Sequence, residues 1–457
     1  MKLIERSRRD IMIRAKINLY NGTVLLAALV LSVMVTAGCT SGKETVSEDQ
    51  YFPGLGNYAD LYLRVSYDLL HMVKYRELGK IGEAAKIAAQ KKMAGGRVLS
   101  RINTPHIMYG GAGAEDLPGN PDVAPDPKGH TLHYQGDPPL SEGDVLIAAN
   151  PTADIEEAHR NGCYVIGVGF PMTTNRYSPP DFNDHPDYFI EDMSDIFIYS
   201  WGPKEDGIVT PALTPNLKIL PTSPMTVVTY RLLTAQLTWN LAHNDTSGTY
   251  KAAEQYLDTL MGRLKTFHAA YIGEAQKAGK IIAERVLKGG KIYPWSGRGE
   301  FFIESSGTAG GLMGVYQLNP EELTSRDIVI LACASATPEE EIEMARRVRE
   351  KGAWMIGIYP FTREDGISTE PLTDLCDMSF DNLSGDNMGV LDIPGYGHKV
   401  VPTTTMMNNY AFWAIVGGYV QAMEARGEAP YYWMSYHVPG GREYDESIRD
   451  AFLERGY

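Results

Sequence analysis

Residues 295–300 combine glycines with polar side chains in a way that could hold a ligand. They read Trp-Ser-Gly-Arg-Gly-Glu, and Gly297 and Gly299 would let the backbone approach a bound group closely. Arg298 between them could bind a phosphate, sulfate or carboxylate through two parallel hydrogen bonds. A dinucleotide site would need a third glycine and an acidic residue about 20 positions further on, where residues 316–319 read Tyr-Gln-Leu-Asn. The pattern therefore favours a small anionic or strongly polar ligand over NAD.

Two further loops place hydroxyl groups before expected helices. Residues 333–339 read Cys-Ala-Ser-Ala-Thr-Pro-Glu, so Ser335, Thr337 and the start of a helix could hold an anion or the hydroxyls of a sugar. The same residues fit a purely structural function, with Thr337 as N-cap and Pro338 in the first helical turn. Residues 402–405 read Pro-Thr-Thr-Thr and leave the same two interpretations open.

These loops lie in the second copy of an internal duplication. Residues 143–149 and 326–332 each read as a buried strand, followed by a helix and a further strand at residues 163–168 or 354–358. The helices between the strands are expected to stop at equivalent glycines, Gly162 and Gly352.

Two more echoes occur in the same order. Residues 218–223 match residues 399–404, and residues 95–98 match residues 289–292. Each copy then reads helix, strand, helix, strand, helix, strand, helix, which predicts an α/β fold with a mostly parallel sheet covered on both faces. We expect the copies to meet near the turn-rich residues 244–248 and a ligand to bind at the carboxyl ends of the strands.

The second copy resembles a SIS (sugar isomerase) domain of the phosphosugar-binding type. That family typically reads Asp, a hydrophobic run, then Ser-Asn-Ser-Gly-Arg-Asn-Pro-x-x-Ile-Glu-Met-Ala, and residues 327–345 align with it without a gap. Residues 309–312 and 440–441 also fit. The resemblance extends from residue 289 to the end, and reaches residues 95–244 only through the duplication. It implies two flavodoxin-like, three-layer units, a sugar-binding or sugar-isomerising activity, and either a homodimer or a pseudo-dimer within one chain.

This sequence departs from the family at the phosphate-binding serines. Gly299 replaces the first serine and Cys333 replaces one of the second pair, while Ser335 stays and Ala336 replaces a glycine. The equivalent turn in the first copy, residues 150–153, is poorer still. Because lost donors would leave phosphate oxygens unpaired, we expect a degenerate first copy with a structural function and a second copy that holds the sugar site.

The resemblance also implies candidates for catalysis. Glu304 matches a family glutamate to within about one residue and is the first candidate for the base of an aldose–ketose isomerisation. His398 and His437 are candidate proton donors. A charged side chain on a helix surface, or a histidine bonded to the backbone, are the competing interpretations. The candidate sugar contacts are Ser296, Gly297, Arg298, Gly299, Ser335, Thr337, Thr403 and Thr404.

The amino-terminal residues read as an export signal. Six basic residues within the first 16 precede an uncharged apolar run at residues 23–37, which is typical of a signal peptide. Residues 36–39, Thr-Ala-Gly-Cys, resemble a bacterial lipobox, so Cys39 would carry a lipid; an anchor helix that stays uncut is the alternative. The predicted organisation is a signal peptide at 1–38, a tether at 39–50, unit one at 51–245 and unit two at 246–457.

Composition and the expected location further limit the possible classes of ligand. The net charge of −15 argues against nucleic-acid binding, and the spacing of histidines and cysteines suggests neither a metal site nor another cofactor. A lipid-anchored location in the cell envelope, facing the periplasm or the exterior, favours a neutral or acidic sugar over a phosphosugar. The hypotheses are an exported sugar isomerase, a non-catalytic carbohydrate-binding or sensing lipoprotein, and a scaffold without a ligand.

Overall fold

The computed structural model describes most of the chain beyond residue 56. The described residues are 57–101, 131–133, 139–149, 153–170, 190–203, 207–297, 300–333, 338–364, 366–385, 389–434 and 440–457. Within this part of the chain no helix combines the length and the apolar composition that a membrane span needs. The predicted signal peptide and Cys39 lie outside the described residues.

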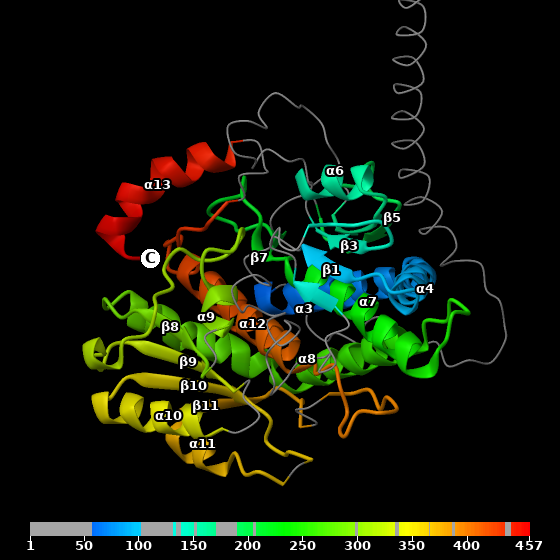
Figure 1. Cartoon of the computed structure of the whole chain (residues 1–457). Helices are drawn as coiled ribbons and strands as arrows, with labels where there is room; N and C mark the ends of the chain where they lie inside the picture. Colours follow the sequence, from blue (N-terminus) through cyan, green and yellow to red (C-terminus); the bar gives the residue numbers. More distant parts are fainter. Residues whose placement is uncertain are drawn as a thin grey trace, which may run out of the picture. The chain divides into compact units, whose positions relative to one another are not determined.

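Unit one is built around a sheet of five parallel strands, sheet one, in the order β2-β1-β3-β4-β5. Its strands β1, β3 and β5 are labelled in Figure 1. Alternate strand residues pack on α4 and α7 on one face and on α6 on the other. This arrangement explains why the strands read as continuous apolar runs, because both faces are covered. The elements are β1 (Val98–Arg101), β2 (Thr131–His133), β3 (Val145–Ala148), β4 (Tyr164–Gly169), β5 (Ile196–Tyr199), α4 (Leu78–Met93), α6 (Ala153–Arg160) and α7 (Pro224–His243).

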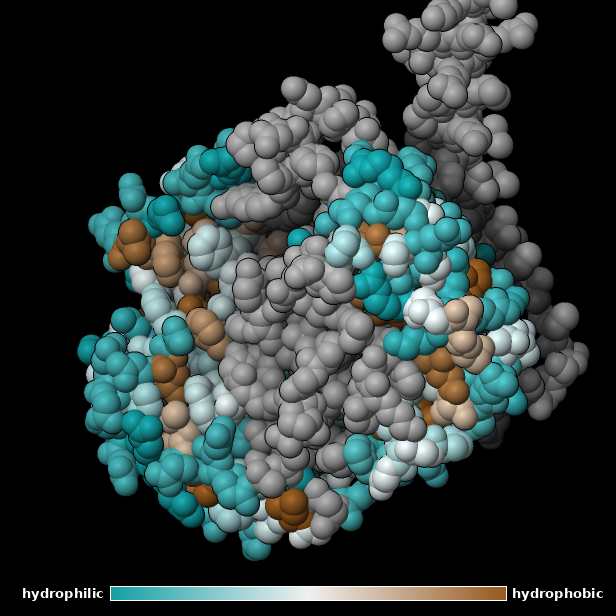
Figure 2. Space-filling view, viewed as in Figure 1, coloured by the Kyte–Doolittle hydropathy of each residue, from teal (hydrophilic) through white to brown (hydrophobic). Residues whose placement is uncertain are grey.

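Unit two repeats this plan around sheet two, four parallel strands in the order β11-β10-β9-β8. Helices α8, α9 and α12 cover one face, and α10 and α11 cover the other (Figure 1). The outer surface around α10 and α11 is mostly hydrophilic (Figure 2), as expected for helices with one buried stripe. The elements are α8 (Lys251–Val286), β8 (Ile292–Trp295), α9 (Glu300–Ser305), β9 (Ile328–Ala332), α10 (Glu339–Lys351), β10 (Trp354–Tyr359), α11 (Glu370–Leu375), β11 (Met378–Asp381) and α12 (Thr404–Glu424).

The remaining elements join or flank these units. Helix α3 begins the body and packs against both α8 and α12. Residues 51–457 form one compact unit. The boundary near residue 245 therefore stays a prediction from the sequence repeat. The other elements are α3 (Tyr58–Arg76), β6 (Gly207–Val209), β7 (Ile219–Pro221), the 3₁₀ turn η3 (Pro320–Glu322) and α13 (Gly441–Arg455).

The predicted α/β fold and the duplication are confirmed down to individual hydrogen bonds. In each unit an aspartate before β3 or β9 accepts two backbone N–H groups, one from the residue before β1 or β8 and one from its own turn, at 2.7–2.9 Å. The bonds run from Arg97 and Ser141 to Asp144, and from Lys291 and Thr324 to Asp327. The helix-stop glycines Gly162 and Gly352 both adopt φ 74°.

Backbone strain is repeated as well. Leu220 and Val401 have φ of 63° and 61°, although neither is a glycine and Val401 is β-branched. Such conformations are costly for these residue types. Each precedes the proline that leads into the long helix of its unit, α7 or α12, so both copies enter that helix through the same unusual turn.

The sequence patterns missed the last strand of each sheet, β5 and β11. Both strands are short and only their middle residues are buried, so they lack the long apolar run that marked the others. The patterns also missed a break between α3 and α4 at Glu77. The buried carboxylate of Glu77 accepts the N–H of Tyr199 at 3.2 Å and the indole N–H of Trp201 at 3.0 Å, which pins the end of β5.

Candidate functional site

The carboxyl edge of sheet two contains the place where the strand order reverses. From β8 the chain goes outward to Val315, which forms an isolated parallel bridge with Ile292, and then returns to the other side of β8 as β9. Loops that leave such a pair of strands in opposite directions create a crevice where α/β proteins bind ligands. The loops that follow β8 and β9 contain most of the predicted sugar contacts.

A network of buried amides and hydroxyls joins this edge to the start of α12. Asn408 donates to the carbonyl oxygen of Cys333 at the end of β9, at 3.2 Å. Asn382, just after β11, donates to Asn408 at 2.9 Å. The hydroxyls of Ser384 and Thr403 lie 3.2 Å apart. The amino-terminal part of α12 is therefore fixed to the ends of two strands by side chains that are shielded from water.

Two arginines support the loop that enters α12. Arg231 of α7 is fully buried and donates to the carbonyl oxygen of Pro402 at 2.6 Å. Arg263 of α8 donates to the hydroxyl of Thr403. Sequence reasoning missed both, because Arg231 belongs to unit one and nothing in its local pattern indicates a contact 171 positions away.

Glu304 lies in the interior, which excludes the interpretation of a charged surface residue. Its relative exposure is 0%. Ser296 supports the start of its helix, α9, by accepting the N–H of Phe301 at 3.4 Å. Helix α9 packs on α12 through an edge-to-face contact between Phe301 and Phe412, with ring centroids 5.3 Å apart. A carboxylate is thus held against the helix that carries the amide network.

Unit one contributes a phenol to this region. Tyr62 of α3 is fully buried, and its ring lies 6.4 Å from that of Tyr410 on α12. Burial raises the pKa of Tyr62 well above its ordinary value, and Tyr410 and Glu304 raise it further. The phenol therefore stays protonated close to the carboxylate of Glu304. No sequence signal pointed to Tyr62, because α3 begins the other copy.

The other predicted residues differ in burial, and several lie outside the described residues. Thr403 uses its hydroxyl within the protein, whereas the buried hydroxyl of Thr404 has no hydrogen-bond partner among the described residues. Gly297 is half-buried, and His398 is exposed in the turn before Lys399. These residues, like Ser296, remain predicted contacts. Six predicted residues lie outside the described part of the chain: Cys39, Arg298, Gly299, Ser335, Thr337 and His437.

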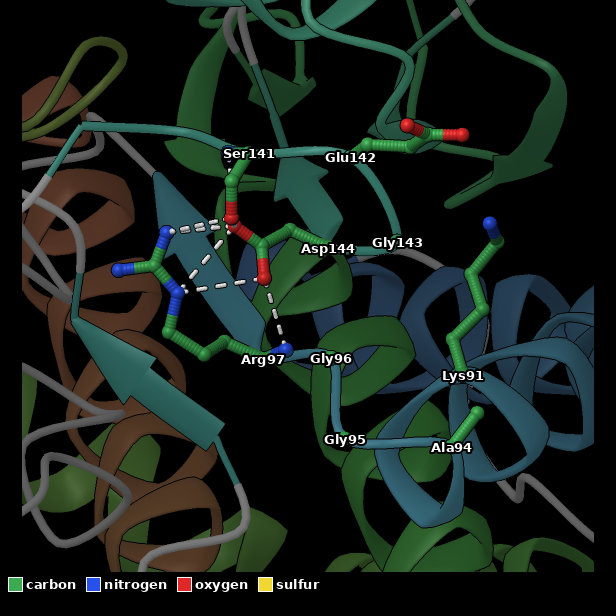
Figure 3. A pocket seen from close by; sticks show the side chains of 9 residues that line it. All are labelled: Lys91, Ala94, Gly95, Gly96, Arg97, Ser141, Glu142, Gly143 and Asp144. Carbon is green, nitrogen blue, oxygen red and sulfur yellow. Dashed lines mark hydrogen bonds and ion pairs between the residues drawn. The ribbon is translucent and has the colours of Figure 1, made fainter.

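A hollow of about 420 Å³ lies in unit one, at the amino-terminal ends of β1 and β3 in sheet one (Figure 3). Asp144 at its wall is bonded to Arg97 and Ser141, and Arg97 also donates to the carbonyl oxygen of Pro139 at 2.7 Å. The equivalent aspartate of unit two, Asp327, accepts the corresponding backbone bonds from Lys291 and Thr324. Because Arg97 and Asp144 at its wall already bind each other, and the same aspartate bonds recur in unit two, we interpret the hollow as a structural feature of the repeat.

The bonds that Asp144 accepts from Arg97 and Ser141 predict that the free energy of unfolding falls in acid. Burial alone would raise the pKa of Asp144, but the bonds from Arg97 and Ser141 outweigh it and lower the pKa from 3.8 to about 2. The ionised form therefore stabilises the fold by about 2 kcal/mol above pH 4, and this contribution is lost as the pH falls toward 2. Urea unfolding of wild type and Asp144→Asn should show this difference at pH 6 and a much smaller one near pH 2. Parallel stability curves would contradict the assignment.

Comparison with known sequences finds relatives without an established activity. A family model described as a domain of unknown function, DUF2529, matches residues 256–423, less than half of the chain. A UPF0309 protein of Brucella anthropi is 24% identical over 234 residues, covering 44% of this chain and 96% of the relative. A UPF0309 protein of Brucella canis is 28% identical over 131 residues, covering 28% of this chain and 54% of the relative.

Solved structures with a similar arrangement include proteins named for sugar-phosphate chemistry. Tagatose-6-phosphate ketose/aldose isomerase from Escherichia coli aligns with 82% of this chain and 95% of its own, at 12% identity and a TM-score of 0.43. The C-terminal domain of glucosamine-fructose-6-phosphate aminotransferase from Francisella tularensis aligns with 82% and 98%, at 12% identity and a TM-score of 0.41. These likenesses are too distant to indicate the ligand of this chain.

Proposed function

We propose that the chain binds a monosaccharide or sugar derivative at the carboxyl edge of sheet two and interconverts its aldose and ketose forms. The observation that carries this proposal is the position of Glu304, a carboxylate fully buried on α9 beside the helix whose amino-terminal part is bonded to the strand ends. Burying a carboxylate costs stability, so its position there calls for a functional explanation.

The proposed reaction needs a base and a proton donor in one enclosed place. Glu304 would remove the proton from the carbon next to the carbonyl group and return it to the former carbonyl carbon. A second proton moves between the two oxygens, so that one carbonyl group is consumed and another is formed. The protonated phenol of Tyr62 near Glu304 supports such an arrangement.

The location and the chemical class of the sugar are part of the proposal. The basic and apolar residues before Cys39 support export and lipid anchoring in the cell envelope, where neutral and acidic sugars are more abundant than sugar phosphates. The packing of α3 on α8 and α12 supports a pseudo-dimer within one chain. A carbohydrate-binding lipoprotein without catalysis is the alternative that the experiment distinguishes.

The decisive variant is Glu304→Gln, which keeps the shape of the side chain and removes the base. We expect aldose–ketose conversion to fall at least about 100-fold, while the thermal shift produced by the sugar persists. The measurement is product formation by the purified chain across neutral sugars, uronates and sugar phosphates. Glu343→Gln is the matched control, because Glu343 lies on the exposed surface of α10 with 66% side-chain exposure.

Four outcomes separate the hypotheses. Binding without turnover in wild type would leave the carbohydrate-binding alternative, and unchanged turnover in Glu304→Gln would refute the assignment of the base. Tight binding of sugar phosphates alone would refute the neutral or acidic class of ligand. A complete lack of thermal shift with every sugar would contradict binding itself.

A further inference from the structure

Two neighbouring asparagines of α12 have opposite surroundings. Both are buried, with relative exposures of 1% for Asn408 and 0% for Asn409. The amide of Asn408 is bonded to Cys333 and Asn382. By contrast, neither the nitrogen nor the oxygen of the Asn409 amide has a hydrogen-bond partner in the described part of the chain. A buried amide without partners destabilises a fold, so this position calls for a specific reason.

The contacts of α12 show which way Asn409 faces. Phe412 and Trp413 follow it by one helical turn and therefore share its face. Phe412 makes an edge-to-face contact with Phe301 of α9, and the ring of Trp413 lies so close to Gly311 that a Cβ atom there would be 3.0 Å away. Asn409 thus faces the segment that begins with α9 and ends near Gly311.

Glu304 belongs to that same segment. It follows Phe301 by one turn of α9, and its carbonyl oxygen accepts the hydroxyl of Thr308 at 2.9 Å. It also lies near enough to Tyr62 to influence that phenol, and the ring of Tyr62 neighbours that of Tyr410, the residue after Asn409. The faces of α9 and α12 that meet at Phe301 and Phe412 thus hold a carboxylate and an unpartnered amide, and Tyr62 of α3 supplies a phenol whose pKa Glu304 raises.

We propose that Asn409 is a ligand-binding residue of the Glu304 site and that it recognises an uncharged hydroxyl-bearing part of the sugar. An amide presents one donor group and one acceptor, and a hydroxyl group also donates and accepts. A phosphate or carboxylate would only accept, which would leave the amide oxygen of Asn409 and the carboxylate of Glu304 facing negative charge. This inference rests on the proposed function and adds the residue and the chemical class.

The charges of the surrounding helices agree with this class. Helix α9 and the first ten residues of α12 contain no lysine or arginine. The described arginines near this end of α12, Arg231 and Arg263, bond to Pro402 and Thr403, before the helix begins. Among the described cations, the counter-charge for an anionic group of the ligand lies at the entry loop and not on the helices that hold Asn409 and Glu304.

The test compares Asn409→Leu with Asn408→Leu in the purified full chain. Without ligand, Asn409→Leu should raise the melting temperature by about 2 °C, because an apolar side chain of similar size replaces an unpartnered amide. Asn408→Leu should lower it by several degrees, since Cys333 and Asn382 lose their partner. Binding is measured by calorimetry with four probes: glucose, fructose, glucuronate and glucose 6-phosphate. Affinity for the probes that wild type binds should fall at least about tenfold in Asn409→Leu.

The outcomes distinguish this inference from the proposed function. A lower melting temperature in Asn409→Leu would show that its amide is satisfied within the protein, and would overturn the inference alone. Unchanged affinity in Asn409→Leu would do the same, while wild type still binds. If wild type binds none of the probes, the proposed function and this inference both fail. Asn409→Ala serves as the second variant if leucine prevents folding.

Discussion

Replacing Gly279 with alanine is expected to lower the free energy of unfolding by about 3 kcal/mol or more. Gly279 lies on α8 where this helix crosses α12, and a Cβ atom at this position would be 2.1 Å from the carbonyl carbon of Gly418 and 2.2 Å from the nitrogen of Tyr419. Both obstacles are backbone atoms, so no side chain can rotate out of the way. The two helices would have to separate.

Helix α12 is also tightly packed on its other side, where it crosses α3. A Cβ atom at Gly417 of α12 would be 2.8 Å from the nitrogen of Ala59 on α3. Because α12 is held between α8 and α3, a displacement of α12 would also move Asn408 and Asn409. We therefore expect Gly279→Ala to weaken sugar binding as well as stability.

The matched control lies on the same helix. A Cβ atom at Gly273 of α8 would have nothing within 4 Å, so Gly273→Ala should stabilise the protein by up to about 1 kcal/mol through helix propensity. Chemical denaturation of wild type and both variants measures the difference. Equal stability of Gly279→Ala and Gly273→Ala would contradict the close crossing.

A second large effect is expected at the buried pair formed by Asp60 and His268. The Nε2 atom of His268 on α8 lies 2.7 Å from the carboxylate of Asp60 on α3, and their side chains are 0% and 1% exposed. Among the described residues, His268→Leu would leave the buried carboxylate of Asp60 with the longer ion pair to Arg64, whose Nε atom lies 3.7 Å away. We expect a loss of about 3 kcal/mol, as for other buried pairs that lose one partner.

Removing both partners should be much milder. In the double variant Asp60→Leu with His268→Leu, no charge remains buried, and apolar side chains between α3 and α8 should recover most of the lost stability. The four proteins form a double-mutant cycle measured by urea unfolding. Additive losses in the double variant would show that the two residues do not form a coupled pair.

The pH dependence provides an independent check of this pair. Burial lowers the pKa of His268 below 6.5, although Asp60 opposes the shift. The folded protein therefore prefers the neutral imidazole, so this residue's contribution is fully present above pH 6.5 and is lost as the pH falls below it. This loss of stability below pH 6.5 should be present in wild type and absent from the double variant.

Much of the fold could be predicted from the sequence because the relevant signals are local. Apolar runs marked β3, β4, β9 and β10, and glycines marked the ends of the helices between them. The repeated order of these signals revealed the duplication. The short edge strands β5 and β11 gave no such signal, because their assignment depends on hydrogen bonds to a neighbouring strand.

Some residues of the candidate site could be predicted from the sequence and others could not. Glu304 was chosen from a resemblance in the sequence, but its burial became visible only when α9 was seen packed on α12. Tyr62, Arg231 and Asn409 could not be found from their local sequence. Tyr62 and Arg231 come from unit one, and Asn409 stands out only by comparison with the fully bonded Asn408.

The sequence by itself determined that one α/β unit occurs twice, because strands, turns and helix ends are encoded by residues close together in the chain. It also singled out the second copy by its glycine-rich and hydroxyl-rich loops. Only the tertiary structure decided that α3 of unit one packs on α8 and α12 of unit two and brings a phenol to Glu304. That packing joins residues far apart in the chain, such as Asp60 and His268 at a separation of 208 positions, and it depends on close helix crossings at Gly279 and Gly417 that no local pattern specifies.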